Sequence, residues 1–133
     1  MEGITATDVA AVGLFAGLDE PSLEIIAGWL ESEEVPVGWA LTHQGSSGYV
    51  FYVLHKGSAD VEVDGKTVRT LSPGDYFGEL SMLGDGRQTA TVVVTSPSVV
   101  WSMFGTRFRE LQRQHPEIAA IIERTAAQRR DTH

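Results

Sequence analysis

Cysteine is absent from the 133 residues of this chain. Its absence excludes disulfides, thiolate nucleophiles and cysteine-ligated zinc together. Positive charge is also scarce, because ten Lys and Arg residues stand against eighteen Asp and Glu, for a formal net charge of −8. Duplex DNA is bound through clustered Lys and Arg that neutralise phosphates, so this balance argues against nucleic acid as a direct partner.

Long apolar runs are missing as well. The clearest one, Tyr49 to Leu54, is far too short to cross a bilayer. Residues 1–5 carry neither a basic patch nor the apolar stretch of a secretory signal. We therefore expect no membrane partner and a cytoplasmic location, and the length predicts one domain with one core of ordinary size.

The first quarter of the chain has a helical pattern. A short helix is expected over Val9 to Phe15. Asp19 then supplies an N-cap carboxylate and Pro21 falls in the first turn of a second helix. Three apolar residues spaced by three and four form its buried face: Leu23, Ile26 and Leu30. The acidic run 31–34 is expected to end this helix as a solvated terminus, so the predicted helical part spans residues 1–34.

From Val35 the apolar period changes to two. Val35 to Leu41 predicts an edge or bent strand, and Tyr49 to Leu54 a buried one. A hairpin is expected over residues 59–71 around Asp64-Gly65, a pair that favours positive φ. Two further strands are expected at residues 91–95 and 99–103. The three tryptophans are expected in the core or against helices: Trp29, Trp39 and Trp101.

The end of the chain returns to a helical period. Phe108 and Leu111 lie on one short helix, and Pro116 is well placed to begin another. The apolar stripe of this last helix consists of Ile118, Ile121 and Ile122. Many short strands broken by Gly and Pro turns indicate a sandwich or roll. The predicted fold is therefore mainly β with flanking helices (α+β): an antiparallel β-roll, or jelly roll, over residues 35–104, with N-terminal helices and two C-terminal helices over 105–130, all in a single domain 1–133.

One segment, residues 73–92, interrupts the strand pattern. Gly78 allows close backbone approach, and Glu79 to Leu83 is long enough for about one helical turn. The first amides of such a turn lack partners, so they form an anion site without any basic side chain. Arg87 would add a charge-assisted contact to a phosphate. An ordinary capped turn has the same composition, so the residues alone leave both interpretations open.

The segment Phe77-Gly78-Glu79-Leu80, followed by residues 87–92 (Arg-Gln-Thr-Ala-Thr-Val), resembles the phosphate-binding cassette of cyclic nucleotide-binding domains. These domains are the cAMP- and cGMP-binding β-rolls of regulatory subunits, bacterial regulators and channels. The turns at Gly45, Gly57 and residues 73–75, and the helices at both ends, also fall where the family has them. The resemblance covers nearly the whole chain, and it implies a non-enzymatic module whose ligand is cAMP or cGMP, with no other cofactor.

The resemblance also implies a role for each cassette residue. Backbone amides of Gly78, Leu80 and their neighbours would bind the cyclic phosphate. Glu79 would accept a hydrogen bond from the ribose 2′-hydroxyl, unless it caps its own short helix. Thr89 would lie near the phosphate and the base, and the helix after Pro116 would cover the base. The implied ligand-binding set is Phe77, Gly78, Glu79, Leu80, Ser81, Arg87, Gln88, Thr89 and Ala90.

The cassette departs from the family pattern at one position. The family's arginine usually stands two residues before the alanine, where this chain has Gln88, and Arg87 stands one residue early. Adjacent side chains of a strand point to opposite faces, so Arg87 is expected to point away from the pocket unless a bulge at residues 84–86 restores its direction. Two functions stay open. The first is a cyclic nucleotide sensor, with cAMP favoured, that moves its C-terminal helices and acts on an effector protein or through a homodimer formed by its last helix. The second is a degenerate domain that no longer binds nucleotide and serves as a protein-interaction module.

An enzyme of the cupin type is the remaining alternative, because cupins share the β-roll and hold a metal with clustered histidines. This chain has four histidines and no His-x-His pair: His43, His55, His115 and His133. It also lacks the Gly-x-Ser-x-Gly elbow of a serine hydrolase. We therefore predict no metal site and no catalytic activity.

Overall fold

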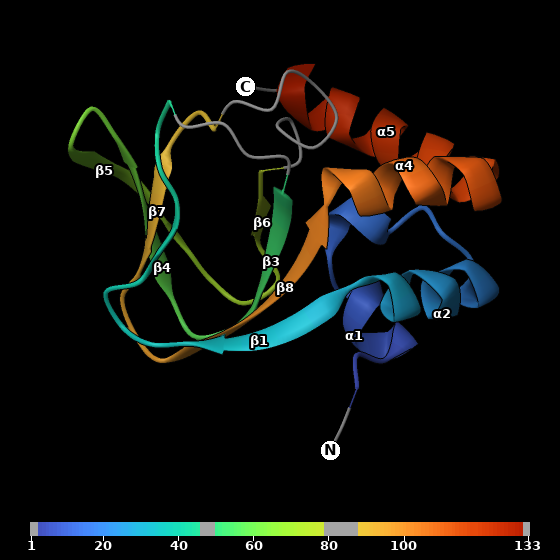
Figure 1. Ribbon diagram of the computed structural model, residues 1–133, viewed down its shortest axis with the longest axis horizontal. Helices are drawn as coiled ribbons and strands as arrows, with labels where there is room; N and C mark the ends of the chain where they lie inside the picture. The colour runs from blue at the N-terminus through green and yellow to red at the C-terminus, as the bar shows by residue number, and fades with distance from the viewer. Residues whose placement is uncertain (1–2, 46–49, 79–87, 132–133) are drawn as a thin grey trace.

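The computed structural model describes residues 3–45, 50–78 and 88–131 (Figure 1). The helices are α1 (Ala6–Ala10), the 3-10 helix η1 (Gly13–Phe15), α2 (Glu20–Trp29), α4 (Gly105–Gln114) and α5 (Pro116–Asp131). The strands are β1 (Glu31–Val35), β2 (Ala40–Thr42), β3 (Val50–Lys56), β4 (Ala59–Val63), β5 (Lys66–Leu71), β6 (Tyr76–Phe77), β7 (Thr91–Val94) and β8 (Ser98–Phe104). In the described part of the chain no helix is long and apolar enough to cross a membrane.

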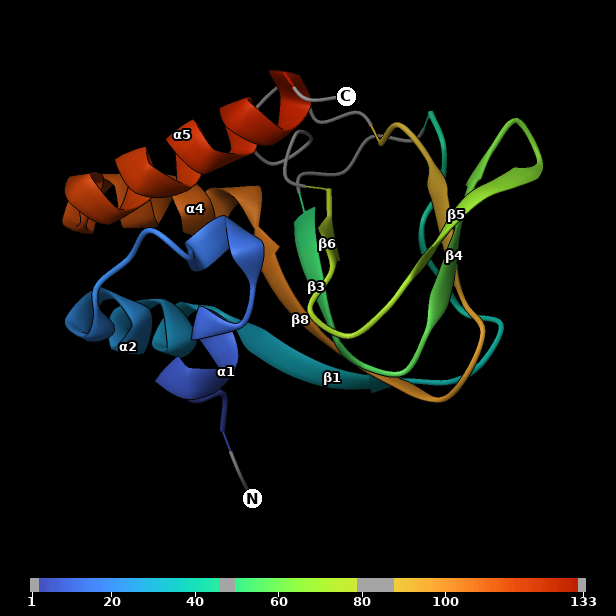
Figure 2. The ribbon, with the colours of Figure 1, turned by 180° about the vertical axis from the view of Figure 1, so that it is seen from behind.

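The strands form two antiparallel sheets that face one another. One has the order β1-β8-β3-β6 and the other β2-β7-β4-β5. Figures 1 and 2 show three layers: the β2-β7-β4-β5 sheet, then the β1-β8-β3-β6 sheet, then the helices packed on its outer side. We call the space between the two sheets the roll interior. This arrangement confirms the predicted mixed fold, an antiparallel roll with helices at both ends of the chain.

Two apolar clusters hold these layers together. Leu54, Leu71 and Val92 belong to the cluster inside the roll, whereas Phe51 and Trp101 belong to the cluster between the sheet and the helices. Strands β3 and β8 contribute to both, because successive side chains of a strand point to opposite faces. Their near-continuous apolar sequences follow from burial on both faces. Each fully buried Leu, Val or Phe contributes about 1.5–3 kcal/mol to stability.

The helix boundaries follow from local chemistry. The Asp19 carboxylate accepts a hydrogen bond from the Ser22 backbone N–H at 3.0 Å, which caps α2 as predicted. Pro116 begins α5, and Ile118 and Ile122 on its buried face are each 1% exposed. The N-terminal helical segment differs slightly from the prediction, since α1 ends at Ala10 and a separate 3-10 turn follows it.

Arginine links the end of α2 to the start of α4. The guanidinium carbon of Arg107 lies 4.5 Å from the Trp29 ring centroid. Its nitrogens donate to the backbone carbonyls of Gly28 and Trp29, both at 3.4 Å. The last carbonyls of a helix have no partner within the helix, so Arg107 satisfies two of them and covers the aromatic ring at the same time.

The acidic run 31–34 is not a helix end, and that prediction was wrong. The residues Glu31–Val35 form edge strand β1, which pairs antiparallel with β8 from Glu31–Ser102 to Val35–Ser98. Only Val35 is buried, and the four residues before it are exposed. Charged side chains on an edge strand oppose pairing with other chains, which gives the acidic run a structural reason.

The predicted strand over Val35 to Leu41 was also wrong, because the chain turns in its middle. The Trp39 N–H donates to the Pro36 carbonyl at 3.2 Å, and Gly38 has a φ of 88°. Strand β2 starts only at Ala40. Trp39 is 59% exposed, so the expectation that all three tryptophans pack in the core or against helices fails for this one.

Candidate functional site

The cassette starts where strand β6 ends, and that start is held by aromatic packing. The rings of Phe77 and Tyr52 are stacked, with centroids 5.3 Å apart and planes inclined by 24°. The two residues are also cross-strand partners in the β3–β6 pair. Phe77 is 8% exposed and belongs to the cluster inside the roll. The residue before the predicted anion site is therefore fixed by the core.

Gly78 follows at a position that accepts no side chain. Its φ is 82°, in the region that L residues rarely adopt. A Cβ atom built there would lie 2.6 Å from the Val50 carbonyl oxygen of β3. Both constraints require glycine, since the chain leaves the sheet here with its backbone directly against a neighbouring strand. The sequence indicated a close backbone approach at Gly78, and the structure shows one to strand β3, whereas its approach to a ligand stays a prediction.

The other end of the cassette is held by hydrogen bonds to the segment around β2. The Gly45 N–H donates to the Gln88 carbonyl at 2.9 Å. The Thr42 hydroxyl donates to the Ala90 carbonyl at 3.0 Å. Both bonds join residues more than forty positions apart in the sequence, and the Thr42–Ala90 bond spans 48 positions. The exit of the cassette is thus tied to β2 before β7 begins.

Burial differs between the neighbouring residues at this exit. Gln88 is 7% exposed, whereas Thr89 is exposed and Ala90 is half-buried. The position that carries the arginine in the resembled family is therefore a buried one, and an uncharged amide occupies it here. Glu79, Leu80, Ser81 and Arg87 lie outside the described residues, so their ligand contacts remain predictions, as do those of the residues placed here.

Polar groups also face the roll interior from the β1-β8-β3-β6 sheet. Ser102 and Tyr52 are cross-strand partners, and Ser102 lies two residues after Val100, which is part of the interior cluster. Burial raises the pKa of the Tyr52 phenol, and the Glu33 carboxylate raises it further. The phenol is therefore neutral over the physiological range and can donate or accept a hydrogen bond.

A cation lies on the facing sheet, and sequence reasoning missed it. Arg69 of β5 pairs with Val61 and stands two residues before Leu71, which is fully buried in the interior cluster. Alternation therefore places Arg69 on the inner face of the hairpin, where it remains exposed because β5 is the edge strand of its sheet. On the opposite face the Thr70 hydroxyl donates to the Asp60 carboxylate at 3.1 Å. The hairpin was predicted from its turn, but the register that assigns Arg69 to a face depends on cross-strand pairing.

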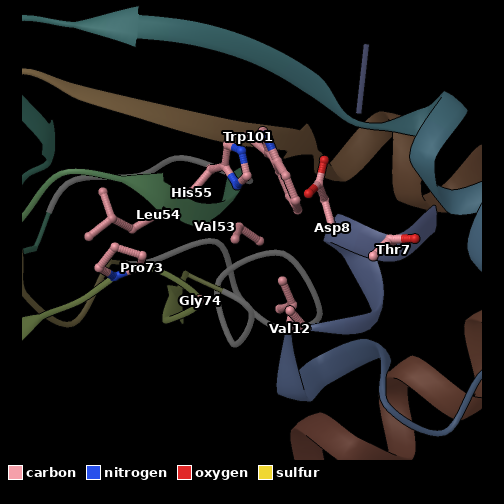
Figure 3. Close-up of a pocket in the computed structure, with 10 residues that line it drawn as sticks. Thr7, Asp8, Val12, Val53, Leu54, His55, Pro73, Gly74 and Trp101 are labelled. Atoms are coloured by element: carbon pink, nitrogen blue, oxygen red, sulfur yellow. The ribbon is translucent and has the colours of Figure 1, made fainter. Parts of the chain in front are cut away.

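A cavity of 360 Å³ lies on the other side of β3 from the roll interior, between α1 and the turn at residues 73–74 (Figure 3). His55 stacks on Trp101 there, with centroids 4.6 Å apart. The described residues that line it include the Asp8 carboxylate but neither Lys nor Arg. A carboxylate repels a phosphate, so this cavity does not suit a cyclic nucleotide. Within the described residues no cluster of His, Asp and Glu could hold a metal ion.

Two curated proteins are similar to this chain over more than two thirds of its length. A cAMP-dependent protein kinase regulatory subunit of Yarrowia lipolytica is 34% identical over 98 residues, covering 74% of this chain and 26% of that protein. A cGMP-dependent protein kinase of Eimeria tenella is 35% identical over 95 residues, covering 71% of this chain and 10% of that protein. The chain thus spans about a quarter or less of the length of these two relatives.

The solved structures agree with the observed fold. A cyclic nucleotide-binding domain of Methylobacillus flagellatus superposes with a TM-score of 0.81 at 17% identity, covering 92% of this chain and 72% of that one. The family model for the cyclic nucleotide-binding domain matches residues 32–115, which include both sheets except part of β1, the whole cassette and α4. The chain belongs to the cyclic nucleotide-binding domain family, a family of regulatory ligand-binding modules.

Proposed function

We propose that this domain is a sensor that binds a cyclic nucleotide, cAMP in preference to cGMP, in the roll interior. One observation carries the proposal: both ends of the cassette are held in place by neighbouring strands and turns, in a chain that belongs to this family. Gly78 is held against β3, and Gln88 is held by the Gly45 amide. Two anchored ends reduce the conformational freedom that a ligand must remove, which favours binding.

The chemistry assigned to the cassette is recognition of a small cyclic anion. Backbone amides from Gly78 onward bind the phosphate, and Glu79 accepts from the ribose 2′-hydroxyl. Arg69 adds positive charge on the inner face of the hairpin, in a chain whose net charge is −8. The preference for cAMP draws support from the curated relatives described as cAMP-dependent regulatory subunits. A cGMP-dependent kinase among the relatives makes cGMP the second ligand to test.

The output of the sensor is a movement of the C-terminal helices. Helix α5 contacts η1 and α4, and Ile118, Ile122 and Ala126 are buried in the same cluster as Trp101. A ligand in the roll shifts this packing only by binding one arrangement more tightly than the other. The moved helix would then contact an effector protein or a second copy of the domain in the cytoplasm.

A specific observation favours a second function, that of a protein-interaction module without ligand. The buried position of the family's arginine is occupied by Gln88. Loss of one partner of a buried charge pair costs about 2–5 kcal/mol. A ligand bound at micromolar concentration gains about 8 kcal/mol, so such a loss moves the dissociation constant toward millimolar.

Isothermal titration calorimetry separates the two functions. The sensor is expected to bind cAMP with a dissociation constant in the micromolar range and cGMP more weakly. The matched control ligand is 5′-AMP, which has the same base and ribose but no cyclic phosphate. Absence of heat with cAMP at millimolar concentration would reject the sensor and leave the interaction module.

A further inference from the structure

Gln44 connects the tip of the β4–β5 hairpin to the start of β7 by hydrogen bonds. Its side-chain Nε2 donates to the Asp64 carboxylate at 3.1 Å, and its Oε1 accepts from the Asp64 backbone N–H at 2.8 Å. Its own backbone N–H donates to the Thr91 hydroxyl at 2.9 Å. One residue therefore contacts the tip of the β4–β5 hairpin and the start of β7, directly after the cassette.

The orientation of the Gln44 amide is determined by its partners. A backbone N–H can meet only an acceptor, so the oxygen faces Asp64 N–H and the nitrogen faces the carboxylate. The hairpin turn fixes the direction of the Asp64 N–H, because Asp64 and Gly65 have φ values of 53° and 79°, as in the tight type I′ hairpin. We call this pair of hydrogen bonds the Gln44–Asp64 bridge.

The bridge lies beside the bond that holds the cassette exit. The next residue, Gly45, donates its N–H to the Gln88 carbonyl at 2.9 Å. Residues 44 and 45 thus hold the hairpin tip on one side and residues 88–91 on the other. We propose that Gln44 is a positioning residue for the ligand site: it adds to the β4–β7 ladder and fixes the cassette exit relative to the tip of the hairpin that carries Arg69. This inference rests on the proposed function for its effect on affinity.

The bridge is expected to matter more for ligand binding than for folding. Gln44 and Asp64 are exposed, so water replaces their hydrogen bonds readily when the bridge is lost. The apolar cluster inside the roll does not include either residue. Without the bridge, the β4–β7 ladder still joins the hairpin to the cassette exit through the pair Glu62–Thr91, but the hairpin tip beyond that pair loses its contact with residue 44, and the ligand must order the tip. We expect Gln44→Ala to weaken cAMP binding about tenfold while the melting temperature stays close to that of the wild type.

A set of charge variants distinguishes positioning from general damage. Gln44→Glu keeps the acceptor for the Asp64 N–H but sets a second carboxylate oxygen against Asp64. Asp64→Asn alone keeps the bridge, because its amide can turn its oxygen toward Gln44, and Asn tolerates positive φ. The double variant restores a donor–acceptor pair. We therefore expect Gln44→Glu to lose affinity for cAMP, Asp64→Asn to bind as the wild type does, and the double variant to recover most of the loss.

Amide hydrogen exchange without ligand tests the same inference independently of nucleotide binding. In Gln44→Ala the N–H of Asp64 loses its acceptor, and the N–H of Gly45 is expected to exchange faster as well, because the exit segment is less restrained. If the wild type binds no cyclic nucleotide, the proposed function fails, but the exchange measurement still tests whether Gln44 restrains the cassette exit. Unchanged exchange at Gly45, or a double variant that stays as weak as Gln44→Glu, would overturn the inference.

Discussion

Replacing Gln88 with arginine is expected to tighten cAMP binding. The side chain at this position is 7% exposed, so a guanidinium placed there is largely removed from water. Truncating one partner of a buried charge pair costs about 2–5 kcal/mol, and we take the low end of that range as the gain from restoring the pair. At about 1.4 kcal/mol per factor of ten, the dissociation constant should fall by roughly thirtyfold or more.

The same substitution should destabilise the domain without ligand. A buried guanidinium without a carboxylate or phosphate partner costs several kcal/mol, and arginine is longer than glutamine. The melting temperature of Gln88→Arg should therefore lie below that of the wild type, and saturating cAMP should raise it by more than it raises the wild type. Opposite effects on the free and bound protein would indicate that residue 88 faces the ligand.

Two variants provide the controls. Gln88→Met has a similar length and no charge, so it should bind no more tightly than the wild type. Thr67→Arg adds the same charge at an exposed position of β5, paired with Glu62, and reports the effect of net charge alone. Calorimetry of all four proteins measures the effect. If Gln88→Arg binds cAMP no better than Gln88→Met does, residue 88 does not face the phosphate.

Three further predictions concern the scaffold. Gly78→Ala should destabilise the fold by about 3 kcal/mol or more in urea unfolding, because residue 78 has a positive φ and its Cβ would clash with the backbone. Gly38→Ala has a positive φ but open space around it, so it should cost only about 1 kcal/mol. Equal costs for the two variants would contradict the clash. Arg107→Ala should lower the free energy of unfolding in urea by about 1 kcal/mol. Arg107→Lys should recover little of this loss, because an ammonium lacks the planar fork that contacts two carbonyls and the ring. Full recovery by lysine would show that the charge alone accounts for the effect. Hydrogen bonds from Ser22 hold the pKa of Asp19 below its usual value of 3.8, so this group stabilises the fold above that value, and its contribution is lost as the pH falls through the lowered pKa. Asp19→Asn still caps α2 but does not ionise, so its urea midpoint should fall less than that of the wild type between pH 5 and pH 2, and an identical pH profile would contradict the assignment.

Elements set by local chemistry could be predicted from the sequence. The hairpin was identified from Asp64-Gly65, whose positive φ values the structure shows. The starts of α2 and α5 followed from a cap and a proline. The acidic strand β1 could not be predicted, because its conformation comes from pairing with β8, about seventy positions later, as in the pair Glu31–Ser102. Edge strands with polar side chains carry no apolar period that would distinguish them from a helix end.

The candidate site divides in the same way. Gly78 could be singled out in the sequence because a glycine before a turn leaves a local pattern, and Gln88 because the resemblance to the family marks its position. Gln44 could not be singled out in the sequence, because nothing in its neighbourhood predicts a contact with Asp64. Arg69 likewise required the register of β5 against β4. Residues that act across the roll become visible only when the two sheets are placed together.

The most direct test of a ligand site between the two sheets is a crystal structure of the domain grown with excess cAMP. We expect a cyclic phosphate beside the Gly78 amide, with the nucleotide between the sheets and Gln88 in contact with it. A roll interior filled by the protein's own side chains, with no nucleotide despite the excess, would contradict it.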